Sequence, residues 1–566
     1  MLEDLTVIIP ALKKRVAFQD DLVKKLDGIT LIQRAINKAM EFRCGRKQIH
    51  VLTDSDEIRL IAERNEVQCY YDAGLVFEGD ASSGDIWEFI EGVASSTSML
   101  LVLSPYSPLL PANLMLQAID TLGLAEEGIL RPVVRIPMRV SRTIGNGTLA
   151  GIFATEHRET EMVSPSFTVL KRSALISRTG DSLGILHWPI PNDYPDINSY
   201  HDWWVCERLI KRKRIVFRVI GDEQVGMGHI YRALSLAHEI VNHEVLFVTD
   251  TSNAIAVSRL AGYDYWLEAY EPYEVVRRIA ELKPDLVVND ILATSADDVM
   301  PLLEQGCRVM NFEDLGEGAG LADLTINELY DNPQLEGESI YWGHRYFFVR
   351  DEFHEAHPLR FRRRVSDILI TFGGTDQHDL ARKVFPVVNT LCQERGIRIH
   401  IAAGAGYAGY DELHRILGEF EHVSLTRSTG VISRIMEKCQ VAIVSNGRTV
   451  YELAHMNIPS IVISQHEREN THEFACEENG FISLGVYHEI LLEHMLVETL
   501  TRLLDDEEYR HNLFNRTTRF DFSKNKQKVL AMILSLLDGG TAGDTASVGS
   551  IQRRGMFPLQ GNGMSL

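Results

Sequence analysis

A histidine follows a pair of glycines where an apolar run gives way to a helical pattern. The glycines are Gly226 and Gly228, the histidine is His229, and the whole transition falls within residues 221–240. Glycine lets the backbone approach a ligand closely, and the first turn of a helix offers unpaired N–H groups to an anion. The helix dipole disfavours an imidazolium there, so the segment predicts a neutral His229 that acts as a general base. A histidine that only caps or packs is an equally good interpretation of this segment alone.

Two later turns between a strand and a helix carry residues suited to a diphosphate. The predicted nucleotide-binding residues, which add to Gly226 and Gly228, are Gly373, Gly374, Thr375, Asn446, Gly447, Arg448 and Thr449. Backbone donors, the Thr449 hydroxyl and the Arg448 guanidinium together fit a diphosphate. Glu452 lies one helical turn beyond Thr449, where we expect it to accept hydrogen bonds from ribose hydroxyls. One glycine after a strand is often only a turn, but three such turns in one chain indicate a nucleotide site.

The elements that must position these turns alternate along most of the chain. Apolar, strand-like runs are followed by amphipathic helical stretches, which is typical of α/β folds whose parallel sheets are covered on both faces. A basic run at residues 211–214 predicts a boundary between a first domain, 1–210, and a second domain, 211–538. We expect the second domain to form two Rossmann-like halves, about 214–350 and 360–538, with ligands beyond the carboxyl ends of the strands. Residues 539–566 are rich in Gly and Ser and predict a disordered tail.

Composition excludes several classes of protein. The 566 residues exceed what one hydrophobic core holds, and the net charge of −22 argues against nucleic-acid binding. No apolar run is long enough to span a bilayer, and the first apolar run has no basic segment before it. The seven cysteines form no CxxC pair, so we expect a reducing cytoplasm and neither a zinc site nor disulfides. The sequence is compatible with a homo-oligomer but does not decide it.

The ordered motifs of the second domain resemble those of the UDP-sugar hydrolase of pseudaminic acid biosynthesis. They are GxGHxxR (226–232), Asp290 after LVVN, Asp314 in NFED, VRDEF (349–353), FGGTD and SNGRTVYEL. The resemblance implies a GT-B fold, a UDP-linked amino sugar, no cofactor, and His229 as the base that activates water against the anomeric carbon. One departure is Ile220, which stands where the family usually has an aspartate. A GT-B glycosyltransferase, in which His229 deprotonates an acceptor hydroxyl, is the alternative.

The first domain resembles CMP-sialic acid synthetases, the cytidylyltransferases that activate nonulosonic acids. The similar stretches are IIPALKKRVAFQDDLVKKLDGITLI, VLTDSDEI, LVLSPYSPLL and YPDINSYHDW. The resemblance implies a Rossmann-like, GT-A-like nucleotidyltransferase that uses CTP, a nonulosonic acid and Mg²⁺.

The residues of the first domain depart from that family where the chemistry takes place. Lysines replace the glycine pair that wraps the CTP phosphates, so the cations that would hold a nucleotide are Lys13, Lys14, Arg15 and Lys24. Asn198 replaces one aspartate of the metal-binding stretch and leaves Asp196 and Asp202 as candidate metal ligands. The pattern fits either a diverged transferase or a domain kept for binding or assembly.

Together, these features predict a bifunctional enzyme of nucleotide-sugar metabolism, in nonulosonic acid or surface glycan biosynthesis. Its predicted ligands are a UDP-sugar and, if the first domain is active, CTP and a nonulosonic acid. A scaffold or sugar-binding protein without catalytic activity is a third interpretation.

Overall fold

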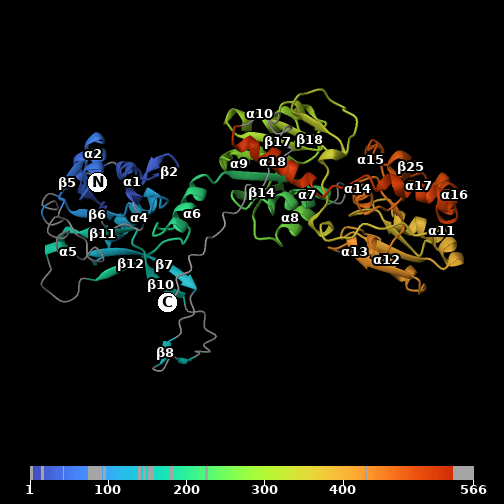
Figure 1. Ribbon diagram of the computed structural model, residues 1–566, viewed down its shortest axis with the longest axis horizontal. Helices are drawn as coiled ribbons and strands as arrows, with labels where there is room; N and C mark the ends of the chain where they lie inside the picture. Colours follow the sequence, from blue (N-terminus) through green and yellow to red (C-terminus); the bar gives the residue numbers. More distant parts are fainter. Residues whose placement is uncertain are drawn as a thin grey trace, which may run out of the picture. The chain divides into compact units, whose positions relative to one another are not determined.

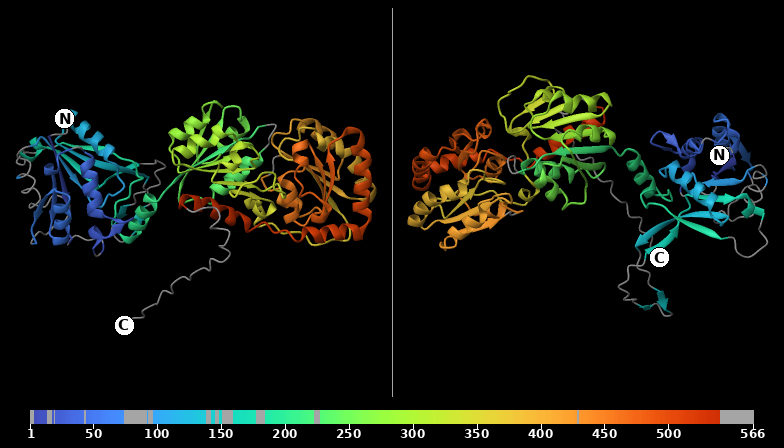
Figure 2. Two further views of the ribbon diagram at one scale, coloured as in Figure 1. Left: turned by 90° about the horizontal axis from the view of Figure 1, so that it is seen from above. Right: turned by 180° about the vertical axis from the view of Figure 1, so that it is seen from behind.

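The chain divides into two compact units, Met1–Arg212 and Lys213–Leu566. The computed structural model describes residues 4–13, 18, 20–42, 44–73, 92, 97–137, 142–144, 148–150, 159–176, 184–222, 227–427 and 430–539 (Figures 1 and 2). Apart from Gly539, the predicted disordered tail lies outside these residues. Within them, every helix is too short or too polar to cross a membrane.

The first unit is built on a mixed sheet with the strand order β10-β7-β11-β6-β1-β4-β5, in which β12 also pairs with β7. The strands β6, β1, β4 and β5 are parallel, whereas β11 and β10 run antiparallel to their neighbours. The sheet consists of β1 (Leu5–Pro10), β4 (Ile49–Thr53), β5 (Gln68–Tyr71), β6 (Met99–Leu103), β7 (Ile129–Pro137), β10 (Glu159–Val163), β11 (Phe167–Lys171) and β12 (Ile185–Pro189). Two small antiparallel sheets pair β2 (Lys25–Leu26) with β3 (Ile29–Thr30) and β8 (Arg142–Ile144) with β9 (Thr148–Ala150).

Helices of the first unit pack their apolar faces against this sheet. They are α1 (Leu31–Glu41), α2 (Asp56–Arg64), α4 (Ala112–Leu124), α5 (Arg172–Ile176) and α6 (Tyr200–Ile210). In α1 the apolar residues recur every three to four positions, so that Leu31, Ala35 and Ala39 all enter the core. The helix begins at a cap in which the Thr30 hydroxyl accepts a hydrogen bond from the Gln33 amide at 3.2 Å.

The first half of the second unit is a parallel, doubly wound sheet with the order β15-β14-β13-β16-β17-β18-β19. Its strands are β13 (Arg214–Val219), β14 (Glu244–Asp250), β15 (Trp266–Tyr270), β16 (Leu286–Asp290), β17 (Arg308–Phe312), β18 (Leu324–Asn327) and β19 (Ile340–Trp342). Its crossover helices are α7 (Gly228–Ala237), α8 (Ala254–Leu260), α9 (Val275–Glu281) and α10 (Ala296–Glu304). The order reverses between β13 and β16, which opens a crevice at the carboxyl ends of these two strands.

The second half repeats this arrangement in the parallel order β22-β21-β20-β23-β24-β25. Its strands are β20 (Asp367–Thr371), β21 (Arg398–Ala403), β22 (Val423–Arg427), β23 (Val441–Val444), β24 (Ser460–Ser464) and β25 (Phe481–Val486). Its helices are α11 (Leu380–Arg395), α12 (Tyr410–Leu417), α13 (Ser433–Met436), α14 (Arg448–His455), α15 (Glu467–Asn470), α16 (Glu489–Asp505) and α17 (Glu507–Thr517). The predicted α/β class, with two Rossmann-like halves in the second unit, is confirmed.

The structure corrects the predicted limits of the two halves. The last helix, α18 (Asn525–Leu537), packs on the core of the first half, where Val529 and Ile533 join the cluster around Ile215 and Phe217. Figure 1 shows this helix, in red, beside the green and yellow elements of that half.

The segment after residue 321, which lacks a regular sequence pattern, contains β18 and β19, which extend the first sheet. These short strands escape a pattern-based prediction because each has fewer than five residues.

A glycine in the second half allows two loops to touch. A Cβ atom on Gly404, just after β21, would lie 2.1 Å from the carbonyl oxygen of Gly374. We therefore expect Gly404→Ala to lower the free energy of unfolding by about 1–3 kcal/mol, as overpacking does. Gly418→Ala is the matched control, because its Cβ would meet nothing nearer than 3.6 Å and its φ is −60°. Equal urea unfolding curves for the two variants would contradict the prediction.

Candidate functional site

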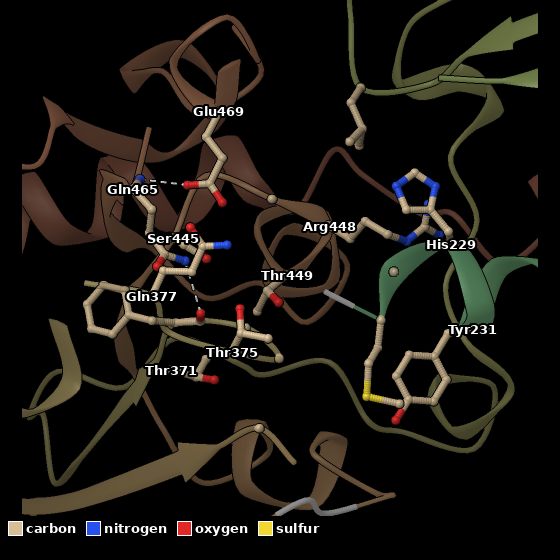
Figure 3. Close-up of a pocket in the computed structure, with 18 of the residues that line it drawn as sticks. His229, Tyr231, Thr371, Thr375, Gln377, Ser445, Arg448, Thr449, Gln465 and Glu469 are labelled. Carbon is tan, nitrogen blue, oxygen red and sulfur yellow. Dashed lines mark hydrogen bonds between the residues drawn. The ribbon is translucent and has the colours of Figure 1, made fainter. Parts of the chain in front are cut away.

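A cavity of about 620 Å³ lies between the two halves of the second unit, at the carboxyl ends of their central strands. The first half contributes His229 after β13 and Glu313 after β17. The second half contributes the turn 373–375 after β20 and residues 447–449 after β23. Figure 3 shows His229 and Tyr231 on α7, on the other side of the cavity from Thr375, Ser445 and Thr449. The topology therefore brings together residues that are more than 200 positions apart.

His229 is held by a buried carboxylate. It lies in the first turn of α7, and its Nδ1 contacts Asp290 Oδ1 at the end of β16. Because the two ring nitrogens lie on opposite sides of the imidazole, this contact directs Nε2 away from Asp290. Burial alone would raise the pKa of Asp290, but Arg232 and His229 hold that pKa below its ordinary value. A charged Asp290 fixes the orientation of the imidazole ring of His229.

Arg232 ties Asp290 to two further buried carboxylates. Its Nε and Nη2 donate to the two oxygens of Asp290 at 2.8 Å and 2.5 Å, and its Nη1 donates to Glu328 at 2.8 Å and to Glu313 at 3.5 Å. The arginine and the three carboxylate side chains are each at most 3% exposed. Burial would lower the pKa of Arg232, but Asp290 and Glu313 raise it.

Arg448 enters this network from the other half of the unit. Its Nη1 donates to Glu328 Oε1, and its Nη2 donates to the carbonyl oxygen of Phe348 at 3.1 Å. Burial and the nearby charge of Arg232 lower the pKa of Arg448 to about 10. Gly228 makes room for this side chain, since a Cβ there would lie 3.2 Å from Arg448 Cδ. Arg448 therefore lines the predicted site, but it is already paired with a carboxylate of the first half.

The remaining predicted diphosphate residues form the cavity wall that belongs to the second half of the unit. Gly373, Gly374, Thr375, Gly447 and Thr449 all line it. Gly373 has a φ of +77°, a conformation that favours glycine. Gly447 precedes α14, and the amides in the first turn of a helix are suited to binding an anion.

Asp376 ends the Gly373–Thr375 turn and helps to fix it. Its carboxylate accepts hydrogen bonds from the backbone amides of Leu380 and Ala381, at 2.8 Å and 2.9 Å, in the first turn of α11. Burial raises the pKa of Asp376 to about 6 despite these two hydrogen bonds.

Two of the predicted nucleotide-binding side chains already have hydrogen-bond partners within the chain. Asn446 does not line the cavity, because its amide donates to the carbonyl oxygens of Glu469 and His472 at 2.8 Å and 3.0 Å and holds that loop in place. Glu452 does line the cavity, but its carboxylate accepts from Arg350 at 2.8 Å and 3.2 Å. Any ribose hydroxyl would therefore have to share Glu452 with Arg350. Gly226 lies outside the described residues.

Several residues that complete the cavity escape a prediction from sequence. Arg350 belongs to the VRDEF motif and Glu313 to NFED, neither with a predicted role of its own. Gln465, Glu469 and His472 belong to none of the quoted motifs. Burial raises the pKa of Glu469 and lowers that of His472. Glu313 has a signal visible only in the structure, a φ of 54° in a residue that is not glycine.

In the first unit, the two described candidate cations already have partners. Lys13 Nζ pairs with Asp20 at 3.0 Å and with Glu57 at 2.5 Å. Lys24 Nζ donates to the Tyr200 hydroxyl at 2.8 Å. Lys14 and Arg15 lie outside the described residues, so the predicted phosphate clamp of the first unit stays a prediction.

The candidate metal ligands of the first unit accept hydrogen bonds from neighbouring residues, and their role as magnesium ligands stays a prediction. Asp196 accepts hydrogen bonds from Ser107 and, at 3.3 Å, from Ser164, and burial raises its pKa. Asp202 accepts from the Asn198 amide and the Ser199 hydroxyl, both at 2.9 Å, at the start of α6. Across the described part of the chain, no three His, Cys, Asp or Glu side chains are grouped as metal ligands. Asp202 is therefore a helix-capping residue in this structure.

Comparison with known proteins links the chain to glycan and nucleotide-sugar proteins. SpsG, a spore coat polysaccharide biosynthesis protein of Bacillus subtilis, is 22% identical over 308 residues, which are 52% of this chain and 89% of SpsG. A UDP-2,4-diacetamido-2,4,6-trideoxy-beta-L-altropyranose hydrolase of Campylobacter jejuni is 26% identical over 178 residues, 30% of this chain and 64% of that enzyme. The predicted resemblance to such a hydrolase is confirmed.

A third relative and two solved structures extend the comparison. An uncharacterised protein of Methanocaldococcus jannaschii is 26% identical over 267 residues, 44% of this chain, and the chain spans only about half (54%) of its length. MurG of Acinetobacter baumannii aligns with 57% of this chain and 99% of its own, at 13% identity and a TM-score of 0.42. A CMP:2-keto-3-deoxy-manno-octonic acid synthetase complexed with CTP aligns with 36% of this chain and 98% of its own, at 11% identity and a TM-score of 0.29. No model of a known protein family matches the chain.

The Asp290 carboxylate should stabilise the second unit in a pH-dependent way. Removal of its charge by Asp290→Asn leaves Arg232 and His229 without their shared partner, which we expect to cost about 3–5 kcal/mol at pH 7. Folding lowers the pKa of Asp290. Its contribution to the free energy of unfolding is therefore complete above about pH 4, the pKa of aspartate in the unfolded chain, and is lost as the pH falls further. Urea unfolding of the wild type and of Asp290→Asn should therefore show a difference in the free energy of unfolding that is constant from pH 7 to pH 5 and narrows below pH 4. If this difference in free energy widened below pH 4, a charged Asp290 would not be what stabilises the folded chain.

A capping role for Asp202 predicts a stability effect that does not depend on metal. We expect Asp202→Ala to lower the free energy of unfolding by about 1 kcal/mol, because the amide of Asn198 loses its acceptor. The loss should be the same with EDTA and with millimolar Mg²⁺ in thermal unfolding of the full chain. Stabilisation by Mg²⁺ that is seen in the wild type and absent in the variant would restore the metal-ligand role.

Proposed function

We propose that the second unit hydrolyses a UDP-linked sugar and releases UDP, with His229 as the general base. The observation that carries this proposal is that the His229–Asp290 pair and the turns suited to a diphosphate lie on opposite walls of one cavity. A volume of about 620 Å³ is within the range of small-molecule sites. The C. jejuni relative is itself named a UDP-sugar hydrolase, which supports the same reaction class.

The diphosphate would bind to the second half of the unit. The first-turn amides of α14, the Thr449 hydroxyl and the Gly373–Thr375 turn all border the cavity there. A helix N-terminus and preorganised donors stabilise the negative charge that builds up on a departing diphosphate. The sugar then extends toward the first half, where His229 lies.

In the proposed reaction, a water oxygen attacks the anomeric carbon as the bond from that carbon to the diphosphate oxygen breaks. The bonding electron pair leaves with UDP, and His229 Nε2 accepts a proton from the water. Asp290 stabilises the resulting imidazolium, which then returns its proton to solvent. The products are the free sugar, UDP and one proton, and no cofactor takes part.

The substrate class follows from the relatives and from the sequence resemblance. We propose a UDP-linked amino sugar used in nonulosonic acid or surface glycan biosynthesis in the cytoplasm. For the first unit we propose a domain that binds CTP or a nonulosonic acid or serves in assembly. Two observations support this proposal. One is the sequence resemblance, and the other is that Asp196 and Asp202 accept hydrogen bonds from serine hydroxyls, for Asp202 at the start of α6.

The role of His229 is tested by His229→Asn in the full chain. With a panel of UDP-N-acetylamino sugars, UDP release should fall about 10²–10⁴-fold, the usual loss when a general base is removed. Calorimetry should show UDP binding close to that of the wild type, because His229 lies on the wall away from the diphosphate turns. His238→Asn, at the end of the same helix and 42% exposed, is the control and should keep full activity.

Two results would change the assignment. Full UDP release by His229→Asn would show that another group is the base. UDP release that depends on an added acceptor alcohol would identify a glycosyltransferase, in which His229 deprotonates the acceptor instead of water.

A further inference from the structure

Two arginines from different parts of the cavity share one carboxylate oxygen. Glu328 Oε1 accepts from Arg232 Nη1 at 2.8 Å and also from Arg448 Nη1. Glu328 follows β18 in the first half, whereas Arg448 begins α14 in the second half. The side chain of Glu328 is fully buried, and its Oε2 has no hydrogen-bond partner in the described part of the chain. The pair between Glu328 and Arg448 therefore bridges the two halves beside the cavity.

The two arginines differ in the number of carboxylates that they contact. Arg232 contacts three carboxylates, those of Asp290, Glu313 and Glu328. Arg448 has only the oxygen that it shares with Arg232, together with the carbonyl oxygen of Phe348, among the described residues. Burial and, after it, the repulsion between two guanidinium groups on one oxygen lower the pKa of Arg448. Of the two arginines, Arg448 has fewer carboxylate partners, and it is the one that lines the cavity, where an incoming anion would reach it.

Arg448 lies where a bound nucleotide would supply such an anion. Arg448 lines the cavity next to Gly447 and Thr449, where the diphosphate is proposed to bind. If Arg448 moved to a diphosphate, Glu328 would keep its hydrogen bond from Arg232 at 2.8 Å. The move would therefore not leave a buried carboxylate without a cation, an outcome that is normally costly.

We propose that Glu328 competes with the nucleotide diphosphate for Arg448, so that the guanidinium passes from the carboxylate to the diphosphate when the nucleotide binds. This inference rests on the proposed function, since it assumes that the cavity takes a nucleoside diphosphate. Glu328 is then a positioning residue that lowers diphosphate affinity. Through Arg232 and Asp290, it also couples occupation of the diphosphate site to the orientation of His229.

The test is calorimetry of UDP and of uridine with the full-length wild type and Glu328→Gln. The amide oxygen of glutamine still accepts from Arg232, but the loss of charge frees Arg448. We expect UDP to bind roughly tenfold more tightly, in keeping with a hydrogen bond between charged groups, and uridine to bind unchanged. In UDP-sugar hydrolysis, the same variant should lower both KM and kcat, a pattern that simple loss of structure does not produce.

A second variant and a control keep the result clear. Glu328→Asp keeps a negative charge in the network but withdraws the oxygen that Arg232 and Arg448 share, so it too should weaken the hold on Arg448 and tighten UDP binding if the glutamine variant folds poorly. Asp367→Asn also removes a buried carboxylate that pairs with an arginine, Arg398 at 2.9 Å, but it lies at the start of β20, outside the cavity lining, and should leave UDP affinity near that of the wild type.

Failure of this inference can be told apart from failure of the proposed function. If the wild type binds UDP and both Glu328 variants bind it no more tightly, the competition between Glu328 and the diphosphate is wrong. If the wild type binds no UDP, the proposed function fails, and inorganic pyrophosphate becomes the probe for the same comparison. Tighter pyrophosphate binding by Glu328→Gln would support the competition, and equal binding would refute it.

Discussion

The second unit depends on a cluster of charges around one buried arginine, Arg232. Asp290, Glu313 and Glu328 surround Arg232, and Arg448 adds a second guanidinium from the opposite half. Burying each of these charges alone would be strongly unfavourable, so each is stable only while the others remain in place. The network that holds the fold together at this point therefore includes Asp290, the residue that orients His229.

The connection between the two halves follows the same principle. The residues of η7 (Asp351–Phe353) and the arginine before it bind alternately to elements of both halves. Arg350 donates to Glu452 of α14, and Glu352 accepts from the Ser433 amide and hydroxyl of α13. Between them, Asp351 contacts Lys526 of α18 and Ser235 of α7, the helix that carries His229. Both cavity walls are therefore fixed to one short segment, which makes the cavity geometry a property of the whole unit.

In the first unit, the residues that make the fold are distinct from those predicted to carry the chemistry. Its parallel strands and the capped helix α1 follow from buried apolar runs and from Thr30, and neither depends on a ligand. In contrast, Asp196 and Asp202 bind serines and backbone, and Lys13 pairs with two carboxylates. Fold and activity depend on different residues here, because an apolar core tolerates changes in loop residues, whereas phosphate and metal binding depend on those loop residues themselves.

The sequence by itself determined the elements, the α/β class and the residues at the strand ends. Buried strands such as β16 and turns such as Gly373–Thr375 are encoded locally, by runs of apolar residues and by glycine. Only the tertiary structure decided the partners: Asp290 for His229, Glu328 for Arg448, Arg350 for Glu452, and the return of α18 to the first half. The reason is physical. A strand or turn depends on its neighbours in the chain, whereas a buried ion pair depends on which distant charge the packing leaves within reach, and no local pattern contains that distance.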